Sequence, residues 1–138
     1  MINISNFTLP IVEKILFGGE RIAIDDKVLK GIDDCHAFLK SFSAEKVIYG
    51  INTGFGPMAQ WRVDDKFLSD LQYNIIRSHS TGAGEPLDDI YVKAAMIARL
   101  GSILQCRSGV HREVAELLVA FINEGLTLVG IVSMVVDR

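Results

Sequence analysis

The sequence has little that would support a metal centre, a disulfide framework or a nucleic-acid surface. Cys35 and Cys106 have no second cysteine at metal or redox spacing, and the three histidines are scattered. We therefore expect buried structural thiols, no disulfide and no metal site. Acidic and basic residues alternate along the chain and sum to a net charge of −3, so the charge pattern favours neither nucleic acid nor a membrane surface as a partner.

Long apolar runs and targeting signals are also missing. The longest apolar stretch, residues 126–136, is too short to span a bilayer. The first residues lack the basic and apolar regions of a secretory signal, so we expect a cytoplasmic protein. With 138 residues, of which 49% are hydrophobic, the chain is long enough for a single domain with a buried core.

Apolar residues at helical spacing predict a mainly α fold with short β elements and glycine-rich loops. Each predicted helix follows a residue that is typical of an N-cap: Thr8, Asp25, Asp64 or Asp65, Asp88 or Asp89, and Ser108. The helix after Asp25 is expected to bury a face that reaches Phe38 and Leu39. A helix over residues 90–105 is apolar on nearly every side, which predicts the centre of the core. Residues 21–24 alternate like a short strand.

One loop, residues 49–57, departs from these patterns, and we call it the glycine loop. Val47 and Ile48 before it are typical of a β-strand, but three glycines within the seven positions 50–56 then exclude both helix and regular strand. The only titratable group of the loop is the phenol of Tyr49. Gly50 follows directly, and its missing side chain allows a ligand to approach the backbone closely. The pattern therefore presents one tyrosine to a ligand.

A second glycine-rich loop, within residues 77–86, follows the next predicted helix. His79 stands at the C-terminal end of that helix, where the negative end of the helix dipole favours a positive charge. The segment Gly82-Ala83-Gly84-Glu85-Pro86 then ends the helix.

Two other interpretations of the glycine loop need to be weighed. Residues 54–59 match the dinucleotide fingerprint G-x-G-x-x-A, which would indicate a βαβ nicotinamide site. Residues 57–63 are too short for the helix that this fingerprint requires, so the sequence argues against a nicotinamide site. The other interpretation is a purely structural turn with Tyr49 as a capping aromatic. The pairing with the second loop favours a functional site over such a turn.

Together, residues 49–56 and 77–86 closely resemble the N-terminal part of the histidine and aromatic amino acid ammonia-lyase family, and the likeness covers about residues 5–127. The resemblance implies the N-terminal domain of the fumarase/aspartase/histidase-like helical fold. It also implies elimination of ammonia from an L-amino acid. In that family a methylidene-imidazolone electrophile, formed autocatalytically from an internal Ala-Ser-Gly, activates the amine as a leaving group.

The resemblance also implies roles for single residues. Tyr49 matches the base that takes the Cβ proton, which requires nearby donors or positive charge to favour the phenolate. His79 matches the position that contacts the substrate's side chain, as in histidine and tyrosine lyases and in aminomutases, and unlike the apolar pair typical of phenylalanine lyases. Gly56 and Gly84 match pocket glycines that contact substrate, and Gly50, Gly54 and Gly82 shape the loops. The small substrate is therefore expected to be histidine or tyrosine.

The sequence departs from the family in two places. It contains no Ala-Ser-Gly, and the nearest string, Arg107-Ser108-Gly109, matches another family element, so no cofactor is expected in this chain. Residues 128–138 form a divergent apolar tail to the single domain 1–138. We expect an N-terminal fragment, arising by truncation, frameshift or a split gene, that is inactive alone. The alternatives are a non-catalytic assembly or binding module of a split lyase, and an aminomutase fragment. The family is homotetrameric, so we expect self-association or a need for a C-terminal portion.

Overall fold

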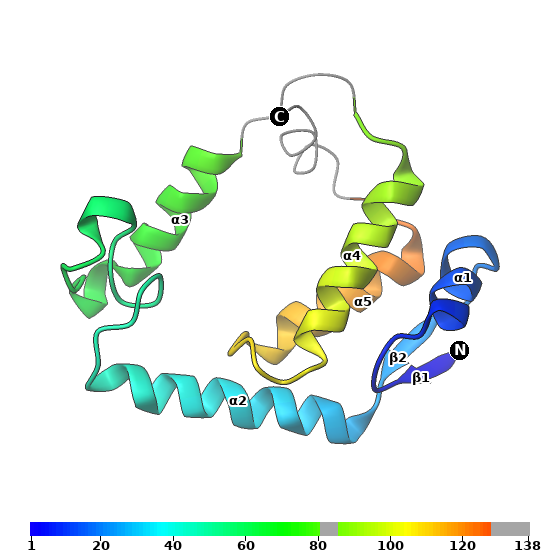
Figure 1. Ribbon diagram of the computed structural model, residues 1–138, viewed down its shortest axis with the longest axis horizontal. Helices are drawn as coiled ribbons and strands as arrows, with labels where there is room; N and C mark the ends of the chain where they lie inside the picture. The colour runs from blue at the N-terminus through cyan, green and yellow to red at the C-terminus, as the bar shows by residue number, and fades with distance from the viewer. Residues whose placement is uncertain (81–85, 128–138) are drawn as a thin grey trace.

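A computed structural model describes residues 1–80 and 86–127 of the chain (Figure 1). The described residues confirm the mainly α prediction, because helices dominate and the β content is two short strands. In chain order the elements are β1 (Ile2–Ile4), α1 (Leu9–Phe17), β2 (Ile22–Ile24), α2 (Asp26–Ala44), η1 (Gly56–Met58), η2 (Asp65–Phe67), α3 (Leu68–His79), α4 (Asp89–Ile103) and α5 (Arg112–Glu124). The apolar tail predicted at 128–138 lies outside the described residues.

The chain begins with a small βαβ unit in which β1 and β2 are parallel and Ile2 pairs with Ile22. The sequence pattern predicted β2 and missed β1. An amide from α5 extends this sheet, since Asn123 Oδ1 accepts the Ile22 N–H at 2.8 Å and Asn123 Nδ2 donates to the Ile22 carbonyl at 2.9 Å. Asn123 therefore pairs with β2 as a neighbouring strand would, and it satisfies both polar groups of Ile22.

The core forms around α4, as its apolar composition predicts. Its buried residues are Val92, Met96, Ile97, Leu100 and Ile103. α1, α5 and the first half of α2 contribute further buried side chains to the same cluster, including Ile15, Ile32 and Ile122. The N-terminal sheet adds Ile4 and Ile22. One continuous core thus joins the two strands to four of the helices.

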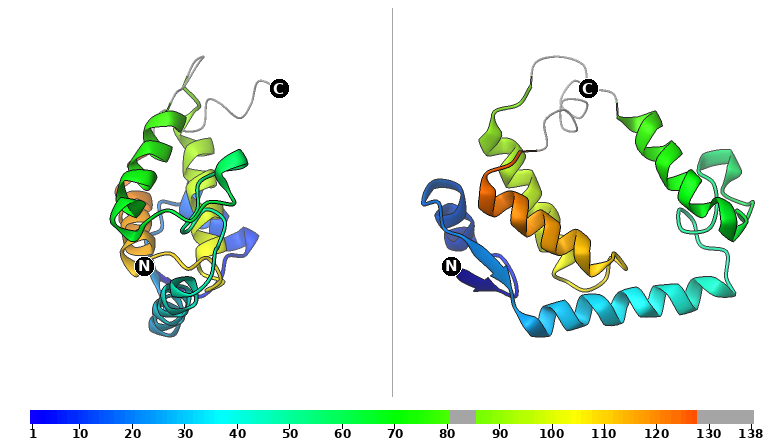
Figure 2. Two further views of the ribbon diagram at one scale, coloured as in Figure 1. Left: turned by 90° about the vertical axis from the view of Figure 1, so that its left-hand side faces the viewer. Right: turned by 180° about the vertical axis from the view of Figure 1, so that it is seen from behind.

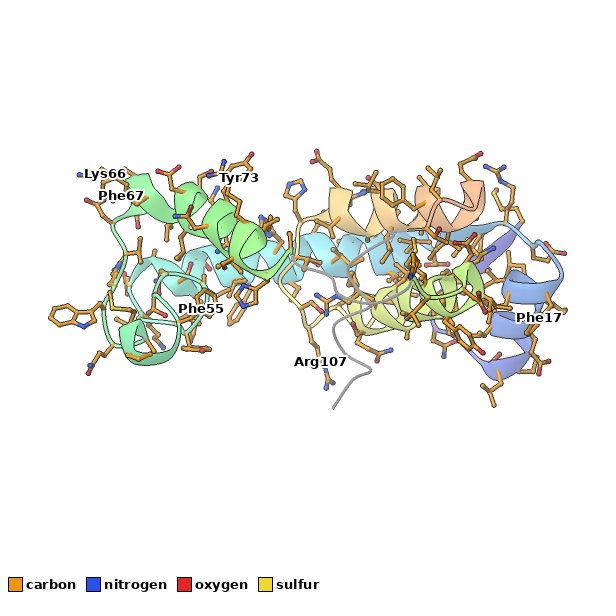
Figure 3. The ribbon with its side chains drawn as sticks, turned by 90° about the horizontal axis from the view of Figure 1, so that it is seen from above. Phe17, Phe55, Lys66, Phe67, Tyr73 and Arg107 are labelled. Atoms are coloured by element: carbon orange, nitrogen blue, oxygen red, sulfur yellow. The ribbon has the colours of Figure 1, made fainter. Side chains whose placement is uncertain are left out.

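The second half of α2 and the whole of α3 extend away from this core (Figures 1 and 2). Leu29 and Ile32 are buried on the first half of α2, but Phe38 on the second half is 63% exposed. The predicted core face of α2 is therefore wrong at Phe38, whereas Leu39 on the same half is half-buried. α3 has no buried residue. Phe67, its N-cap, and Tyr73 within it are both exposed (Figure 3).

The helix starts match the predicted N-caps for α1, α2 and α4. Asp64 caps the short η2 turn, and Phe67 is the N-cap of α3, so this helix starts later than predicted. Asp25 accepts the Lys27 N–H through its side chain, as expected for an N-cap, whereas Ser108 does not cap α5. The N-cap of α5 is His111, whose Nδ1 accepts the Glu113 N–H. At the other end, Gly125 closes α5 in the left-handed conformation, as predicted.

Gly109, in the α4–α5 connection, offers a test of how α2 packs on the core. Its φ is +65°, and an added Cβ would overlap Leu39 Cδ2. We expect Gly109→Ala to lower the free energy of unfolding by about 2–4 kcal/mol, because a left-handed alanine is strained and the added methyl group overpacks the site. Urea denaturation measures the change.

Gly125→Ala is the matched control for this substitution. Gly125 has a φ of +66°, but nothing lies within 4 Å of an added Cβ. Only the backbone strain remains, so the expected loss is about 1 kcal/mol. Equal losses in the two variants would contradict the contact between Gly109 and Leu39.

Candidate active site

Tyr49 lies in a hydrogen-bonded turn at the start of the glycine loop. The N–H groups of Ile51 and Asn52 both donate to the Ile48 carbonyl, at 3.1 and 3.2 Å. Residues 47 and 48 are therefore not a strand, and the β prediction for them was wrong. The Tyr49 side chain is 62% exposed, and its ring packs edge-to-face with that of Phe55, with the centroids 5.6 Å apart. The turn thus presents the phenol at the surface.

The three glycines of the loop differ in what they require. Gly50 has a φ of +76° directly after Tyr49, a conformation that favours glycine. Gly54 lets the chain fold back on η1, since an added Cβ would lie 2.6 Å from the Cβ of Met58. Gly56 has a φ of +56° at the start of η1. Gly50 and Gly54 accordingly determine the backbone path on either side of the turn.

His79 is the last residue of α3 and is exposed. Its Nδ1 lies 2.9 Å from the Ile75 carbonyl oxygen and 2.9 Å from Ser78 Oγ. A carbonyl can only accept, so this contact requires a hydrogen on Nδ1. The neutral ring then has a lone pair on Nε2, and Nε2 is the ring atom that can accept a hydrogen bond from a ligand.

The structure does not bring Tyr49 and His79 into contact. α3 begins at Leu68 and has 12 residues, so His79 stands at its far end, about 18 Å along the helix axis from the first residue of α3. Among the described residues, no hydrogen bond or ring contact joins the two side chains. Gly82 and Gly84 of the second loop lie outside the described residues, and their predicted roles stay predictions.

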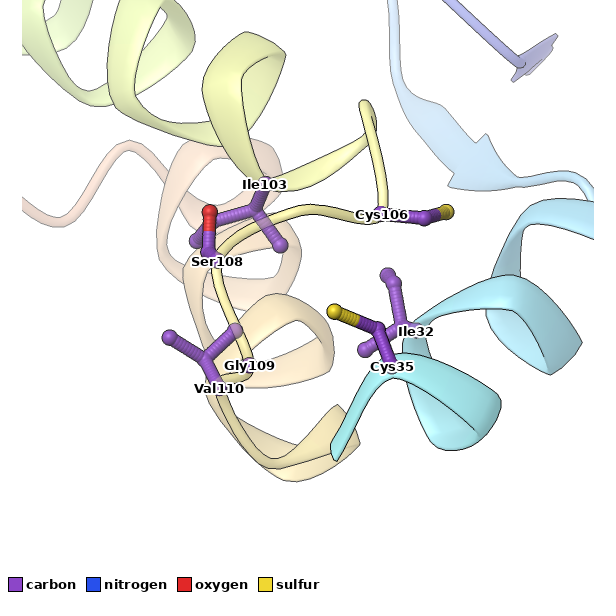
Figure 4. A pocket seen from close by; sticks show the side chains of 7 residues that line it. All are labelled: Ile32, Cys35, Ile103, Cys106, Ser108, Gly109 and Val110. Carbon is purple, nitrogen blue, oxygen red and sulfur yellow. The ribbon is translucent and has the colours of Figure 1, made fainter. Parts of the chain in front are cut away.

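Two adjoining hollows lie between α2 and the α4–α5 connection. The smaller is lined by Cys35 and Cys106, among others (Figure 4). The larger, of about 400 Å³, shares both cysteines and reaches Ile51 of the glycine loop. Burial raises the pKa of the Cys106 thiol, and the neighbouring Cys35 raises it further. A raised pKa lowers the thiolate fraction, so this thiol is a weak nucleophile at neutral pH.

The described ranges, 1–80 and 86–127, contain neither a metal-binding group of side chains nor a membrane-spanning helix. Within them, no three His, Cys, Asp or Glu side chains are grouped as they would be around a metal ion. No helix in those ranges combines the length and the apolar character needed to cross a membrane. The dinucleotide interpretation is also wrong there, because the fingerprint glycines precede the short η1 turn and follow no strand.

Comparison with known proteins identifies the family. The aromatic amino acid lyase family matches residues 7–129. The chain belongs to that family. Among its relatives, a probable histidine ammonia-lyase of Thermoplasma acidophilum is 38% identical over 105 residues, which are 75% of this chain and 21% of the relative. The histidine ammonia-lyase of Salmonella paratyphi B is 37% identical over 107 residues, 77% of this chain and 21% of that protein.

A solved structure of another family member has the same fold. The tyrosine aminomutase of Streptomyces globisporus superposes with a TM-score of 0.80 at 26% identity, over 87% of this chain and 23% of that one. The aromatic amino acid lyase relatives are thus matched over about a fifth of their length. The resemblance inferred from residues 49–56 and 77–86 is confirmed at the level of the family.

The sequence pattern does not reveal the two polar residues whose side chains hold the glycine loop by hydrogen bonds. Asn52 is 3% exposed and Thr53 is 0% exposed. In the sequence, Asn52 and Thr53 are simply loop residues between Gly50 and Gly54. Their one sequence signal is composition, because Asn and Thr readily hydrogen-bond to nearby backbone groups in turns.

Proposed function

We propose that this chain supplies the base-bearing part of an amino acid ammonia-lyase. In this proposal Tyr49 removes the Cβ proton of the substrate, and His79 contacts the substrate's side chain. The observation that carries the proposal is the exposed phenol of Tyr49, fixed in a turn of a chain that matches the aromatic amino acid lyase family over residues 7–129.

The surroundings of Tyr49 support a role toward a ligand. Its ring packs edge-on against Phe55, which restricts the orientation of the phenol, and the adjacent Gly50 has a positive φ that favours glycine. A phenol that acts as a base near neutral pH needs donors or positive charge around its oxygen. We propose that these groups come from parts of the lyase outside the described residues.

The geometry of His79 supports a substrate whose side chain carries a hydrogen-bond donor. With Nδ1 donating to the Ile75 carbonyl, Nε2 accepts from an imidazole N–H or a phenol O–H. We therefore propose L-histidine or L-tyrosine as substrate, deaminated to the α,β-unsaturated acid. In the same proposal Gly56 and Gly84 line the pocket.

The cofactor belongs to another segment in this proposal. The family's electrophile forms from Ala-Ser-Gly, and the 138 residues contain no such tripeptide. The electrophile is therefore supplied by another segment in this proposal, and the described residues serve only to bind the substrate and to take its proton. We propose that the 138-residue chain is inactive alone and acts in the cytoplasm only when joined by a segment that contains the electrophile.

The exposed apolar side chains on α3 and on the second half of α2 favour a binding partner for this part of the molecule. α3 buries none of its residues, and Phe67, Tyr73 and Ile76 are exposed. Phe38 and Phe42 are exposed on the second half of α2. Apolar side chains grouped in this way are typical of surfaces that another chain or segment covers. We propose that the segment that contains the electrophile and further copies of the chain cover them.

Reconstitution tests the proposal directly. We expect the chain alone to give no urocanate from histidine and no coumarate from tyrosine. Co-expression with the part of the Salmonella paratyphi B lyase that lies outside the matched segment should restore turnover, measured by the ultraviolet absorbance of those products. We call this assembly the reconstituted lyase. Turnover by the chain alone would contradict the division of roles, and failure to associate would favour a decayed fragment.

An aminomutase is the second candidate, favoured by the TM-score of 0.80 to the Streptomyces globisporus tyrosine aminomutase. An aminomutase returns the amine to the carbon skeleton and gives a β-amino acid. Chromatography of the products formed by the reconstituted lyase separates the two candidates. A non-catalytic assembly module predicts association of the segments with neither product above the level of the complementing segment alone.

A further inference from the structure

The N–H groups on either side of Tyr49 are both bound by buried side chains. Asn52 Oδ1 accepts the Ile48 N–H at 2.8 Å, and Thr53 Oγ1 accepts the Gly50 N–H at 3.2 Å. Asn52 and Thr53 are the only buried polar residues in the described part of the chain. Two consecutive side chains thus hold the Val47–Ile48 peptide and the Tyr49–Gly50 peptide, which flank the Ile48–Tyr49 peptide.

Asn52 also fixes the turn to α2. Its Nδ2 donates to the Ser43 carbonyl at 2.9 Å and to the Lys46 carbonyl at 2.7 Å. Ser43 belongs to the last turn of α2, where carbonyls have no partner within the helix. That helix ends at Glu45 in the right-handed region and has no basic residue in its last turn. The Asn52 amide therefore binds the Ser43 carbonyl at this helix end, beside Arg62 Nη2, which donates to the Ala44 carbonyl at 3.2 Å.

The main chain of Asn52 adds a third attachment. Its carbonyl accepts the Val63 N–H at 2.9 Å, and the next residue, Thr53, forms a β-bridge with Arg62. One residue accordingly joins the end of α2, the Tyr49 turn and the segment that leads to α3. A rigid support of this kind determines where an exposed side chain points.

We propose that Asn52 is the positioning residue for Tyr49. The inference rests on the proposed function of Tyr49 as the base. Asn52 uses one acceptor and two donors of its amide in three different directions, a set that neither aspartate nor leucine offers. Because the groups that it binds are part-buried, removal of the amide leaves unpaired polar atoms and releases the turn from α2. Thr53 contributes the second, weaker hold through Gly50.

Asn52→Leu in the full chain tests this, because leucine has a similar shape and no polar atoms. By amide hydrogen exchange we expect the Ile48 N–H to exchange about tenfold faster or more, while amides of α4 keep their rates. By NMR we expect the contacts between the Tyr49 and Phe55 rings to be lost, while the signals of Tyr91 on α4 stay in place. A loss of global stability would instead change both regions together.

Asn123→Leu is the matched control, because it removes an amide that also binds through both of its polar atoms. It should accelerate exchange at Ile22 and leave the Tyr49–Phe55 contacts intact. Thr53→Val is the second variant, and we expect faster exchange at Gly50 but not at Ile48. If Asn52→Leu folds poorly, the exchange rates of Gly50 and Ile48 in Thr53→Val still show whether each buried side chain protects its own amide of the turn.

Unchanged exchange at Ile48 together with retained ring contacts would overturn the inference. So would an equal loss of the ring contacts in Asn52→Leu and Asn123→Leu. In the reconstituted lyase, Asn52→Leu should lower kcat about tenfold or more with a smaller change in KM, since the base is displaced rather than removed. If Tyr49→Phe leaves turnover intact, the proposed function fails, whereas the exchange and ring-contact results still decide the positioning role separately.

Discussion

Tyr49→Phe lowers the kcat of the reconstituted lyase by about 100- to 10,000-fold, the range expected when a general base is removed. The substitution deletes only the hydroxyl, and the ring can keep its edge-on contact with Phe55. Because the side chain is exposed, we expect the free energy of unfolding to change by less than about 0.5 kcal/mol. Steady-state rates and urea denaturation of the same preparations separate loss of chemistry from loss of fold.

Tyr73→Phe is the matched control for this experiment. Tyr73 is also exposed, but it lies on α3 outside the glycine loop. We expect its loss to leave kcat within about twofold of the parent value, as is typical of surface substitutions away from the site. Turnover that survives in Tyr49→Phe, or falls equally in both variants, would show that Tyr49 is not the base.

Features that depend on neighbouring residues were predictable from the sequence. Asp25 caps α2 through the N–H two residues on, and Gly125 ends α5 in the left-handed conformation that glycine favours. α4 lies at the core because its sides are apolar in almost every direction. Each of these features arises from a few adjacent positions, so no knowledge of the tertiary fold was needed.

Features that depend on distant contacts were not predictable. The strand β1 is only three residues long and exists through pairing with β2, across the whole of α1. Phe38 belongs to an apolar stripe that ought to be buried, yet it stands beyond the end of the core. On α3, Ile76 is exposed as well. An apolar pattern indicates that a face tends to be covered, but it does not say whether the covering group belongs to the same folded unit.

The candidate site shows the same division. The glycines and the tyrosine were visible as a local pattern, and the comparison confirms the family that this pattern indicates. The role of Asn52 was not visible, because two of its partners are the carbonyls of Ser43 and Lys46 near the end of the preceding helix. In sequence, an Asn between glycines is equally typical of an ordinary turn.

Substitution of His79 by leucine should have the largest effect on substrate choice. With Nδ1 donating to the Ile75 carbonyl, the Nε2 lone pair of His79 is the acceptor proposed for the donor on the substrate's side chain. Leucine leaves that donor unpaired in the closed pocket. We expect the ratio of kcat/KM for the histidine or tyrosine substrate to that for phenylalanine to fall by about 1,000- to 10,000-fold, because sites that pair a buried polar group discriminate on that scale.

His79→Gln is the conservative comparison, since glutamine keeps a side-chain acceptor at the same position. It should retain much of the preference for a donor-bearing substrate, whereas His79→Leu should not. His79 is exposed at the end of α3, so both variants should unfold at nearly the same urea concentration as the parent chain. If both lose activity on all three substrates in parallel, His79 orients the loop or the base and does not select the substrate. If only leucine reverses the preference, the acceptor on residue 79 is what distinguishes a donor-bearing side chain from an apolar one.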